Sequence, residues 1–224
     1  ARTVLADVAV QVIKLGFVGS PSVLAGITEV ASDYEQTPLV AYMPDLSWWD
    51  EPSIDSYLDA FEELILPLTS VLVGNHSTLR RWLLPDWDGA GNPGPRDIAR
   101  AAHDHGVPYT LVTGIALPDQ FMDNVLASPE VILASDKFER FDAVFNGAGD
   151  TLSAALAALL ASGESLPTAV SEALSYLDRS LNGGFSPGMG HALPDRLFWA
   201  QSDDGDADDP EASDDPLLSR QTLQ

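Results

Sequence analysis

The chain of 224 residues contains no cysteine. This absence excludes a disulfide framework, a thiolate metal site and a cysteine nucleophile. Long apolar stretches are also missing, because no run approaches the roughly 18 consecutive apolar residues that a membrane-spanning helix needs. Residues 1–11 carry one arginine and one aspartate and lack the pattern of a secretory signal. We therefore expect a soluble, cytoplasmic protein with no membrane partner.

Basic residues are scarce, since 11 lysines and arginines stand against 34 acids and give a net charge of −23. Only two lysines occur, Lys14 and Lys137. A surface of this sign repels the phosphate backbone of nucleic acids, so no nucleic-acid partner is expected. Hydrated carboxylates keep a protein soluble where salt screens charge, which favours a halophilic source. The same composition also fits an acidic protein from an ordinary organism.

The apolar fraction of 45% is enough for a folded domain, which we place at residues 1–201. Residues 202–224 hold eight acids and no base over 202–216, and they predict an acidic, disordered tail. Within the domain, short apolar runs alternate with helical patterns, which predicts an α/β fold with a mostly parallel central sheet and helices on both faces. Strands are predicted at 10–16, 38–42, 70–73 and 109–113, helices at 21–34, 54–66, 77–84, 96–105, 151–162 and 167–181, and a hairpin pairing 131–134 with 138–141.

The segment Asn146–Thr151 reads NGAGDT and precedes the apolar helix predicted at 151–162. Two glycines around Ala148 let the backbone approach a ligand and turn successive amides toward one point. The helix adds its unpaired N–H groups and the positive end of its dipole. Gly147, Ala148 and Gly149 are therefore predicted to form an anion hole, with Asp150 as the base that takes a proton from a hydroxyl, as phosphoryl transfer requires. The alternative is that Asp150 is a structural helix N-cap.

Several segments together resemble a known enzyme family. The run NGAGDTLSAALAALLASG is similar to the G-[AT]-G-D motif of ribokinase-like kinases, whose aspartate is the catalytic base. The chain resembles vitamin kinases of that superfamily at Ile13–Ser20 (IKLGFVGS), Leu64–Leu68 (LILPL) and Leu111–Gly114 (LVTG). Its ending resembles that of bacterial hydroxymethylpyrimidine/phosphomethylpyrimidine kinases at Gly184–His191 (GFSPGMGH) and Pro194–Ala200 (PDRLFWA). The resemblance covers about residues 4–201.

This resemblance implies a ribokinase-like fold that lacks the first strand–helix units of the family. It implies ATP-dependent phosphorylation of hydroxymethylpyrimidine and its monophosphate in thiamine biosynthesis, with Asp150 as base and Mg²⁺ as metal. The nucleotide-binding residues it implies are Asn75, Thr113, Gly114 and Thr151. The small-molecule partners are then ATP and the pyrimidine, and a homodimer is the implied assembly.

The chain also departs from the family pattern. The family's D-P-V is matched by Met43-Pro44-Asp45, so its aspartate has become Met43, and Asp45 is the candidate metal ligand two positions later. The glutamate of P-N-x-x-E, which helps to hold magnesium, is replaced by Thr78, and the glycine-rich segment that holds the pyrimidine has no counterpart. Two alternatives therefore stay open: a pyridoxal kinase, and a catalytically degenerate kinase-like protein that binds a ligand.

Four further residues have two interpretations each. His76 follows a predicted strand end, where ligands bind in such sheets, and could approach the phosphates or serve the fold. Trp48 and Trp49 could cover the site or pack as core or interface residues. Lys14 could line the site, or only extend its charged end from a buried strand to solvent.

Overall fold

The computed structural model describes residues 2–200, and its centre is a six-stranded sheet in the order β1-β2-β3-β4-β5-β6. The first four strands pair in parallel, and β5 and β6 continue the sheet in antiparallel fashion. This arrangement confirms the mostly parallel sheet. The strands are β1 (Ile13–Leu15), β2 (Leu39–Met43), β3 (Val71–Asn75), β4 (Tyr109–Ala116), β5 (Phe121–Ala127) and β6 (Ile132–Glu139).

Helices connect the parallel strands and follow the last antiparallel one. Helix α2 joins β1 to β2, α3 joins β2 to β3, and α4 and α5 join β3 to β4, while α6 and α7 follow β6. The helices are α1 (Arg2–Asp7), α2 (Pro21–Ala31), α3 (Glu51–Leu64), α4 (His76–Leu83), α5 (Pro95–Asp104), α6 (Ala148–Ala161) and α7 (Leu166–Asn182). Short 3₁₀ turns follow at Ser32–Tyr34, Leu66–Leu68 and Phe198–Ala200. None of the described helices is long and apolar enough to cross a membrane.

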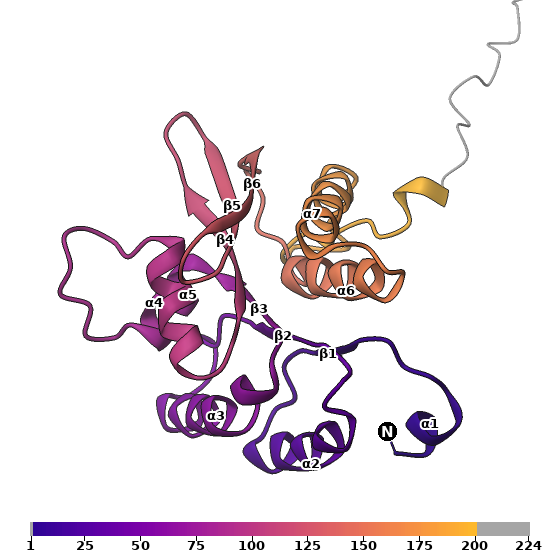
Figure 1. The fold of residues 1–224 in the computed structure, drawn as a ribbon. Coiled ribbons are helices and arrows are strands. Elements are labelled where there is room, and N and C mark those ends of the chain that lie inside the picture. The colour runs from indigo at the N-terminus through magenta and orange to yellow at the C-terminus, as the bar shows by residue number, and fades with distance from the viewer. Residues whose placement is uncertain (1, 201–224) are drawn as a thin grey trace, which may run out of the picture.

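The sheet is covered on both faces, as the alternation of strands and helices predicts. One apolar core packs the sheet against α2, α3, α4 and α5, and a second core packs it against α6 and α7 (Figure 1). Strand β2 serves both cores, because Leu39 and Ala41 face the first while Val40 and Tyr42 face the second. Successive side chains of a strand point to opposite faces, so a strand buried on both sides is continuously apolar.

The antiparallel end of the sheet differs from the prediction. The hairpin expected to pair 131–134 with 138–141 is wrong, because both segments belong to the single strand β6, which pairs with β5. Strand β5 was not predicted at all. Both strands carry polar residues among their apolar ones, such as Asp123 in β5 and Ser135 in β6, whose side chains bond to each other at 2.8 Å. This polar pair lies within the sheet, and Ser135 falls between the two segments that the predicted hairpin would pair.

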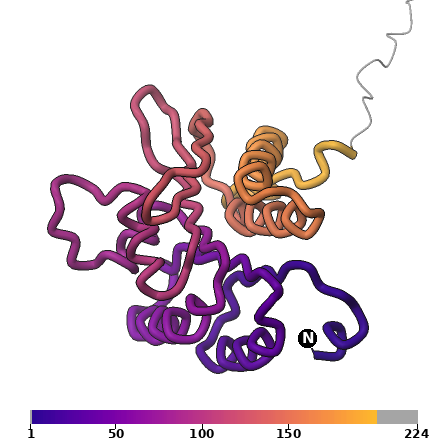
Figure 2. Tube along the Cα trace, in the orientation of Figure 1, coloured from indigo at the N-terminus to yellow at the C-terminus, as the bar shows by residue number. Residues whose placement is uncertain are grey.

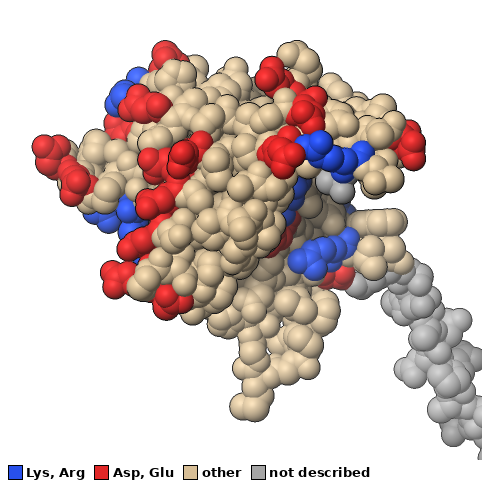
Figure 3. Space-filling model, turned by 90° about the horizontal axis from the view of Figure 1, so that it is seen from below, with Lys and Arg blue, Asp and Glu red and all other residues tan. Residues whose placement is uncertain are grey.

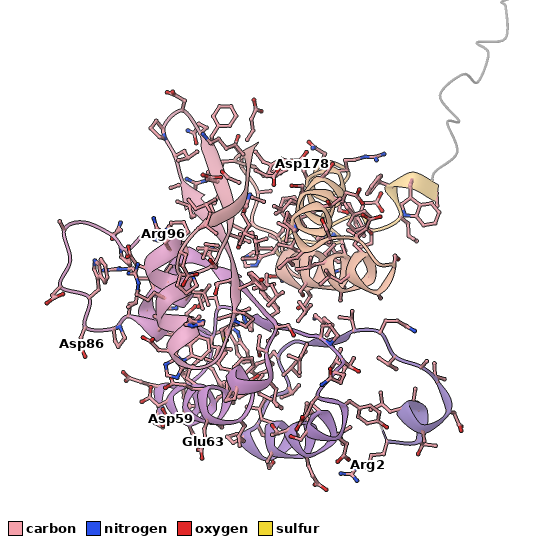
Figure 4. The ribbon with its side chains drawn as sticks, in the orientation of Figure 1. Arg2, Asp59, Glu63, Asp86, Arg96 and Asp178 are labelled. Atoms are coloured by element: carbon pink, nitrogen blue, oxygen red, sulfur yellow. The ribbon has the colours of Figure 1, made fainter. Side chains whose placement is uncertain are left out.

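The last described segment returns to the face that carries α6 and α7 (Figure 2). Backbone bonds join Asn146 to Ala192 and Ala192 to Val144, so this ending braces the loop that enters α6. The tail predicted at 202–224 lies outside the described residues. Acidic side chains outnumber basic ones on the face seen in Figure 3. Two of the acids, Asp59 and Glu63, lie on the side of α3 that points away from the sheet (Figure 4). The halophilic source stays a prediction.

Candidate functional site

The segment NGAGDT forms the start of α6 itself. The helix begins at Ala148, three residues before its predicted start, because Gly147 takes the left-handed conformation (φ 82°) and is the N-cap. Glycine adopts this conformation without the steric cost of a side chain. Asp150 is therefore the third residue of the helix, and its interpretation as an N-cap is wrong. The amides of Ala148, Gly149 and Asp150 have no partner within the helix, and they lie at the positive end of its dipole.

The carboxylate of Asp150 forms an ion pair with the ammonium of Lys14. The distance from Lys14 Nζ to Asp150 Oδ1 is 2.6 Å, and it joins β1 to α6, 136 positions apart in sequence. The Asp150 side chain is 55% exposed and that of Lys14 25% exposed, so the carboxylate faces solvent from a partly covered partner. Of the two interpretations of Lys14, its place in the site is the one that agrees with this geometry.

Tyr42 of β2 lies directly under the first turn of α6. A Cβ atom on Gly149 would overlap the phenol ring and its hydroxyl, so only glycine allows the helix to approach the sheet this closely. Lys14 Nζ lies 5.9 Å from the centre of the same ring. Burial raises the pKa of Tyr42 to about 12, and the carboxylates of Asp150 and Asp45 add to the rise. The phenol is therefore neutral at physiological pH and keeps its proton beside Asp150.

A second cation lies on the other side of the helix N-terminus. Arg196 Nε donates to Thr151 Oγ1 at 2.9 Å, and the same hydroxyl donates to the carbonyl of Gly147 at 2.8 Å. A Cβ on Gly147 would lie 2.8 Å from Arg196 Nη2, so the guanidinium lies against the N-cap. Tyr176 of α7 holds this segment by donating to the carbonyl of Arg196 at 2.8 Å. Thr151 thus ties the C-terminal ending to α6, and its role toward a nucleotide stays a prediction.

These groups border an open cavity of about 730 Å³ that runs along α6 toward α7. Its polar lining comes from six side chains, and the remainder is apolar surface of α6. A concave, mostly apolar site with a few convergent charged groups is typical of small-molecule binding. The polar lining residues are Lys14, Asp150, Thr151, Glu172, Tyr176 and Arg196.

The other predicted nucleotide residues lie together at the carboxyl end of β3 and at the neighbouring positions of β4. Asn75 is opposite Thr113 in the sheet register, and a Cβ on Gly114 would overlap the Asn75 amide. The polar side-chain atoms of Asn75 and Thr113 form hydrogen bonds with the backbone. Asn75 Oδ1 accepts from the Ser77 amide at 2.9 Å and so caps α4. Thr113 Oγ1 donates to the carbonyl of Gly74 at 3.3 Å. We call Asn75, Thr113 and Gly114 the β3–β4 group.

The candidate metal ligand, Asp45, lies in the loop after β2. No group of three or more histidine, aspartate or glutamate side chains suited to a metal ion occurs within residues 2–200. Asp45 pairs with Arg81 at 3.1 Å and accepts bonds from Ser47. Although partial burial alone would raise the pKa of Asp45, the Ser47 and Arg81 interactions outweigh it and lower the pKa below its usual value. The carboxylate therefore already has a cation, and its role as metal ligand stays a prediction.

The two positions that depart from the family pattern do not line the cavity beside Asp150. Met43 is fully buried in the core beneath α2 to α5, and Thr78 is 6% exposed in α4. Both line a separate cavity of about 360 Å³, which Arg81 also borders. A carboxylate in place of Met43 would enter an apolar core, which is costly without a partner. Met43 and Thr78 therefore line a different cavity from the one that Lys14 and Asp150 border.

His76 and Trp49 contact other parts of the fold, whereas Trp48 is mostly exposed. His76 Nε2 lies 2.8 Å from the carbonyl of Pro93, which directs the ring toward the loop before α5. Trp49 packs edge-on against Phe17 at 5.3 Å between ring centres and contacts Tyr57. Trp48 stacks on Trp49 and is 66% exposed. The packing interpretation agrees with Trp49, and Trp48 is the surface member of the same aromatic cluster.

Sequence reasoning missed three residues of the site: Tyr42, Arg196 and His191. His191 Nδ1 lies 2.9 Å from Asn146 Oδ1, at the entrance to α6. The signal for Arg196 and His191 was present in the C-terminal ending, which resembles the family but carried no role. Tyr42 gave no signal, because one tyrosine in an apolar strand is an ordinary core residue.

Comparison with known proteins shows similarity to one enzyme family. A sequence profile of the phosphomethylpyrimidine kinase family matches residues 1–195. The hydroxymethylpyrimidine/phosphomethylpyrimidine kinase of Mycobacterium leprae is 28% identical over 207 residues, which cover 88% of this chain and 72% of that protein. A chloroplastic thiamine biosynthetic bifunctional enzyme of Arabidopsis thaliana is 26% identical over 193 residues, covering 81% of this chain and 35% of that enzyme.

The fold also has solved counterparts. An ADP complex of Bacillus subtilis pyridoxal kinase superposes with a TM-score of 0.76 at 19% identity, covering 88% of this chain and 74% of that one. This likeness confirms the ribokinase-like fold class that the sequence predicts. The family assignment rests on the sequence, because the profile match spans most of the chain. The chain belongs to the phosphomethylpyrimidine kinase family and is a phosphotransferase.

Proposed function

We propose that this protein transfers the γ-phosphoryl group of ATP to the hydroxymethyl group of hydroxymethylpyrimidine and of its monophosphate, in thiamine biosynthesis. The observation that carries the proposal is the exposed carboxylate of Asp150 in the first turn of α6, on the wall of a cavity of about 730 Å³. The family profile and the names of the relatives support the reaction class and the substrate.

In the proposed reaction, Asp150 takes the proton of the substrate hydroxyl as its oxygen attacks the γ-phosphorus. The new O–P bond forms, the bond from the γ-phosphorus to the β,γ-bridging oxygen breaks, and ADP leaves. The amides of Ala148, Gly149 and Asp150 hold the negative oxygens of the moving phosphoryl group, because preorganised donors are effective where charge develops. Gly147 shapes this anion hole through its left-handed turn.

The nucleotide is proposed to lie across the carboxyl edge of the sheet, from α6 toward β4. Asn75, Thr113 and Gly114 would line its path, and Thr151 would hold the entrance to α6. Magnesium would arrive with ATP as the MgATP substrate, since such ions are held largely by phosphate oxygens and water with one or two carboxylates. Asp45 is the carboxylate proposed for that contact, and using it would require Arg81 to release it.

The test is turnover by the whole chain with MgATP and hydroxymethylpyrimidine, followed by phosphorus NMR of the product. Asp150→Asn should lower kcat by about 10²–10⁴, the usual contribution of a general base. The control is Asp86→Asn, because Asp86 is exposed in the loop before α5 and lies at the periphery (Figure 4). Full turnover in Asp150→Asn would overturn the assignment of the base.

The same assay separates the two alternatives. Phosphorylation of pyridoxal without turnover of hydroxymethylpyrimidine would make the chain a pyridoxal kinase, for which the TM-score of 0.76 supports the fold alone. Binding of ATP or pyrimidine by calorimetry with no transfer to either acceptor would identify a degenerate kinase-like protein. Met43 and Thr78 are the residues that motivate this last reading.

A further inference from the structure

Lys14 is one of only two lysines in the chain, and it lies where its charge meets Asp150. The other, Lys137, is exposed on β6, at the opposite end of the sheet. Lys14 is a β1 residue with a neighbouring strand on one side only, and its side chain crosses to the first turn of α6. In a chain with so few lysines, this placement gives the site a cation that composition alone would not predict.

The room for this ion pair is provided by Gly16. A Cβ atom on Gly16 would lie 2.9 Å from Lys14 Nζ and 3.0 Å from Asp150 Oδ1. A carbon atom that close to both charged atoms would displace one or both of them. The small residue at position 16 and the pair it accommodates therefore form one arrangement, assembled from β1 and α6.

The pair engages one carboxylate oxygen and leaves the other accessible. Lys14 Nζ approaches Oδ1, and within residues 2–200 no side chain bonds to Oδ2. The ammonium is also confined, because it lies 5.9 Å from the Tyr42 ring centre and its side chain is only 25% exposed. A carboxylate fixed through one oxygen presents the other in a defined direction, which is what proton abstraction from a bound hydroxyl needs.

Stability alone is a weak explanation for the pair. Partly exposed ion pairs contribute little to folding, because solvent screens the attraction and the side chains lose freedom. Two glycines, Gly16 and Gly149, are nevertheless fitted around Lys14, Tyr42 and Asp150. We therefore interpret the close packing at these two glycines as a means of positioning Asp150, with little contribution to the stability of the fold.

We propose that Lys14 is a positioning residue for the phosphoryl-transfer reaction, which holds Asp150 through Oδ1 so that Oδ2 faces the substrate hydroxyl. The inference rests on the proposed function, because it assigns a base to the same site. Lys14 acts on the reaction through Asp150, and Gly16 acts through both. When Asp150 accepts the hydroxyl proton through Oδ2, the Lys14 ammonium remains a hydrogen-bond donor to Oδ1 and keeps the carboxyl group in place.

The first test compares Lys14→Met with Lys14→Arg in the whole chain. Methionine keeps an unbranched apolar stem but removes the charge, and we expect kcat to fall by about 10- to 100-fold, as expected for a misplaced catalytic group. KM for ATP should change by less than about threefold, and the melting temperature by only a few degrees. Lys14→Arg should recover several-fold of the lost kcat, since it restores a cation beside Oδ1. Lys137→Met is the matched control and should behave as wild type.

The second test disturbs the Lys14–Asp150 ion pair while keeping both side chains. Gly16→Ala should displace two flexible side-chain ends, which leaves the fold intact and lowers kcat in the same way as Lys14→Met. Gly26→Ala in α2 is the control, because a Cβ there meets nothing within 4 Å. In the Lys14→Met background, Gly16→Ala should cost much less than in wild type, since residues that act as a unit are not additive.

The outcomes distinguish the inference from the function on which it rests. If wild type transfers no phosphoryl group to any acceptor, both fall together. If wild type is active and Asp150→Asn is impaired while Lys14→Met keeps its kcat, the function stands and the role of Lys14 is overturned. A fall in kcat that follows lost thermal stability, without rescue by arginine, would make Lys14 merely structural and equally overturn the inference.

Discussion

Two regions at the carboxyl edge of the same sheet use their polar residues in opposite ways. Around the start of α6, the charged side chains of Lys14 and Asp150 bond to each other and leave the carboxylate 55% exposed. In the β3–β4 group, Asn75 bonds to the backbone and hydroxyl of Ser77, and Thr113 bonds to a backbone carbonyl. In the first region, an exposed carboxylate forms an ion pair with a neighbouring side chain. In the second region, the polar side chains form hydrogen bonds with the backbone and so stabilise the fold.

From this difference we can predict which substitutions should lower the reaction rate and which should lower the stability of the fold. A side chain that caps a helix contributes to stability, because it satisfies a backbone amide that has no other partner. An exposed carboxylate contributes little to stability but can move a proton. We therefore expect variants near α6 to lose rate with the fold retained, and variants of the β3–β4 group to lose stability first.

The largest effect that would sharpen this contrast is expected from Gly149→Ala. Its Cβ would overlap the Tyr42 phenol, so the first turn of α6 must move away from β2. Overpacking of this kind costs about 1–3 kcal/mol of unfolding free energy, and the displaced anion hole should lower kcat by at least about 10²-fold. Urea unfolding and steady-state kinetics on the same sample measure the two effects.

The double variant Gly149→Ala with Tyr42→Leu provides the control, since a shorter side chain relieves the overlap. Most of the lost stability should return, together with part of the rate. A Gly149→Ala protein with unchanged kcat would show that the close approach of α6 to β2 is not needed for catalysis, and it would break the contrast between the two regions.

Asn75→Ala is expected to have a smaller effect, which falls on the unfolding free energy and not on kcat. Its side chain caps α4 by accepting from the Ser77 amide, so the unfolding free energy should fall by about 1 kcal/mol. Because its oxygen is directed at Ser77, kcat should change by no more than a few-fold, while KM for ATP reports any contact with the nucleotide. Asn75→Asp is the control, since aspartate also caps helices. A loss of kcat comparable with that of Asp150→Asn, at unchanged stability, would contradict this assignment.

The parallel part of the fold could be predicted from the sequence because burial on both faces makes a strand continuously apolar. Runs such as Val40-Ala41 and Leu111-Val112 carry that signal, and glycines such as Gly106 (φ 95°) and Gly163 (φ 94°) follow helices as predicted. Strands β5 and β6 could not be predicted in the same way. Their exposed face is polar, and Asp136 with Lys137 resembles a turn when only composition is considered.

The residues of the site also fall into a group that could be predicted from the sequence and a group that could not. Asp150 and its glycines lie in one continuous motif, and a motif can be recognised without knowing the fold. Lys14 and Tyr42 come from two different strands, so their meeting with Asp150 depends on the packing of α6 over β1 and β2. The start of α6 at Ala148 depends on the left-handed turn at Gly147, which sequence suggests only as one of several possibilities.

An effect confined to high pH, and absent at physiological pH, concerns the phenol beneath the site and would show how tightly α6 covers β2. Because burial raises the pKa of Tyr42 to about 12, the folded protein keeps this proton after the unfolded chain has lost it near pH 10. Its contribution to stability is therefore complete below pH 10 and is lost between pH 10 and 12, on the order of 1 kcal/mol per pH unit. Tyr42→Phe should reduce that slope and remove one late tyrosinate step in an ultraviolet titration, and the slope that remains is expected from Tyr57, whose pKa is also raised by burial. Tyr34→Phe, in the turn after α2, should leave both unchanged. A Tyr42 that ionises near pH 10 would mean that water reaches the phenol and that α6 covers β2 only loosely.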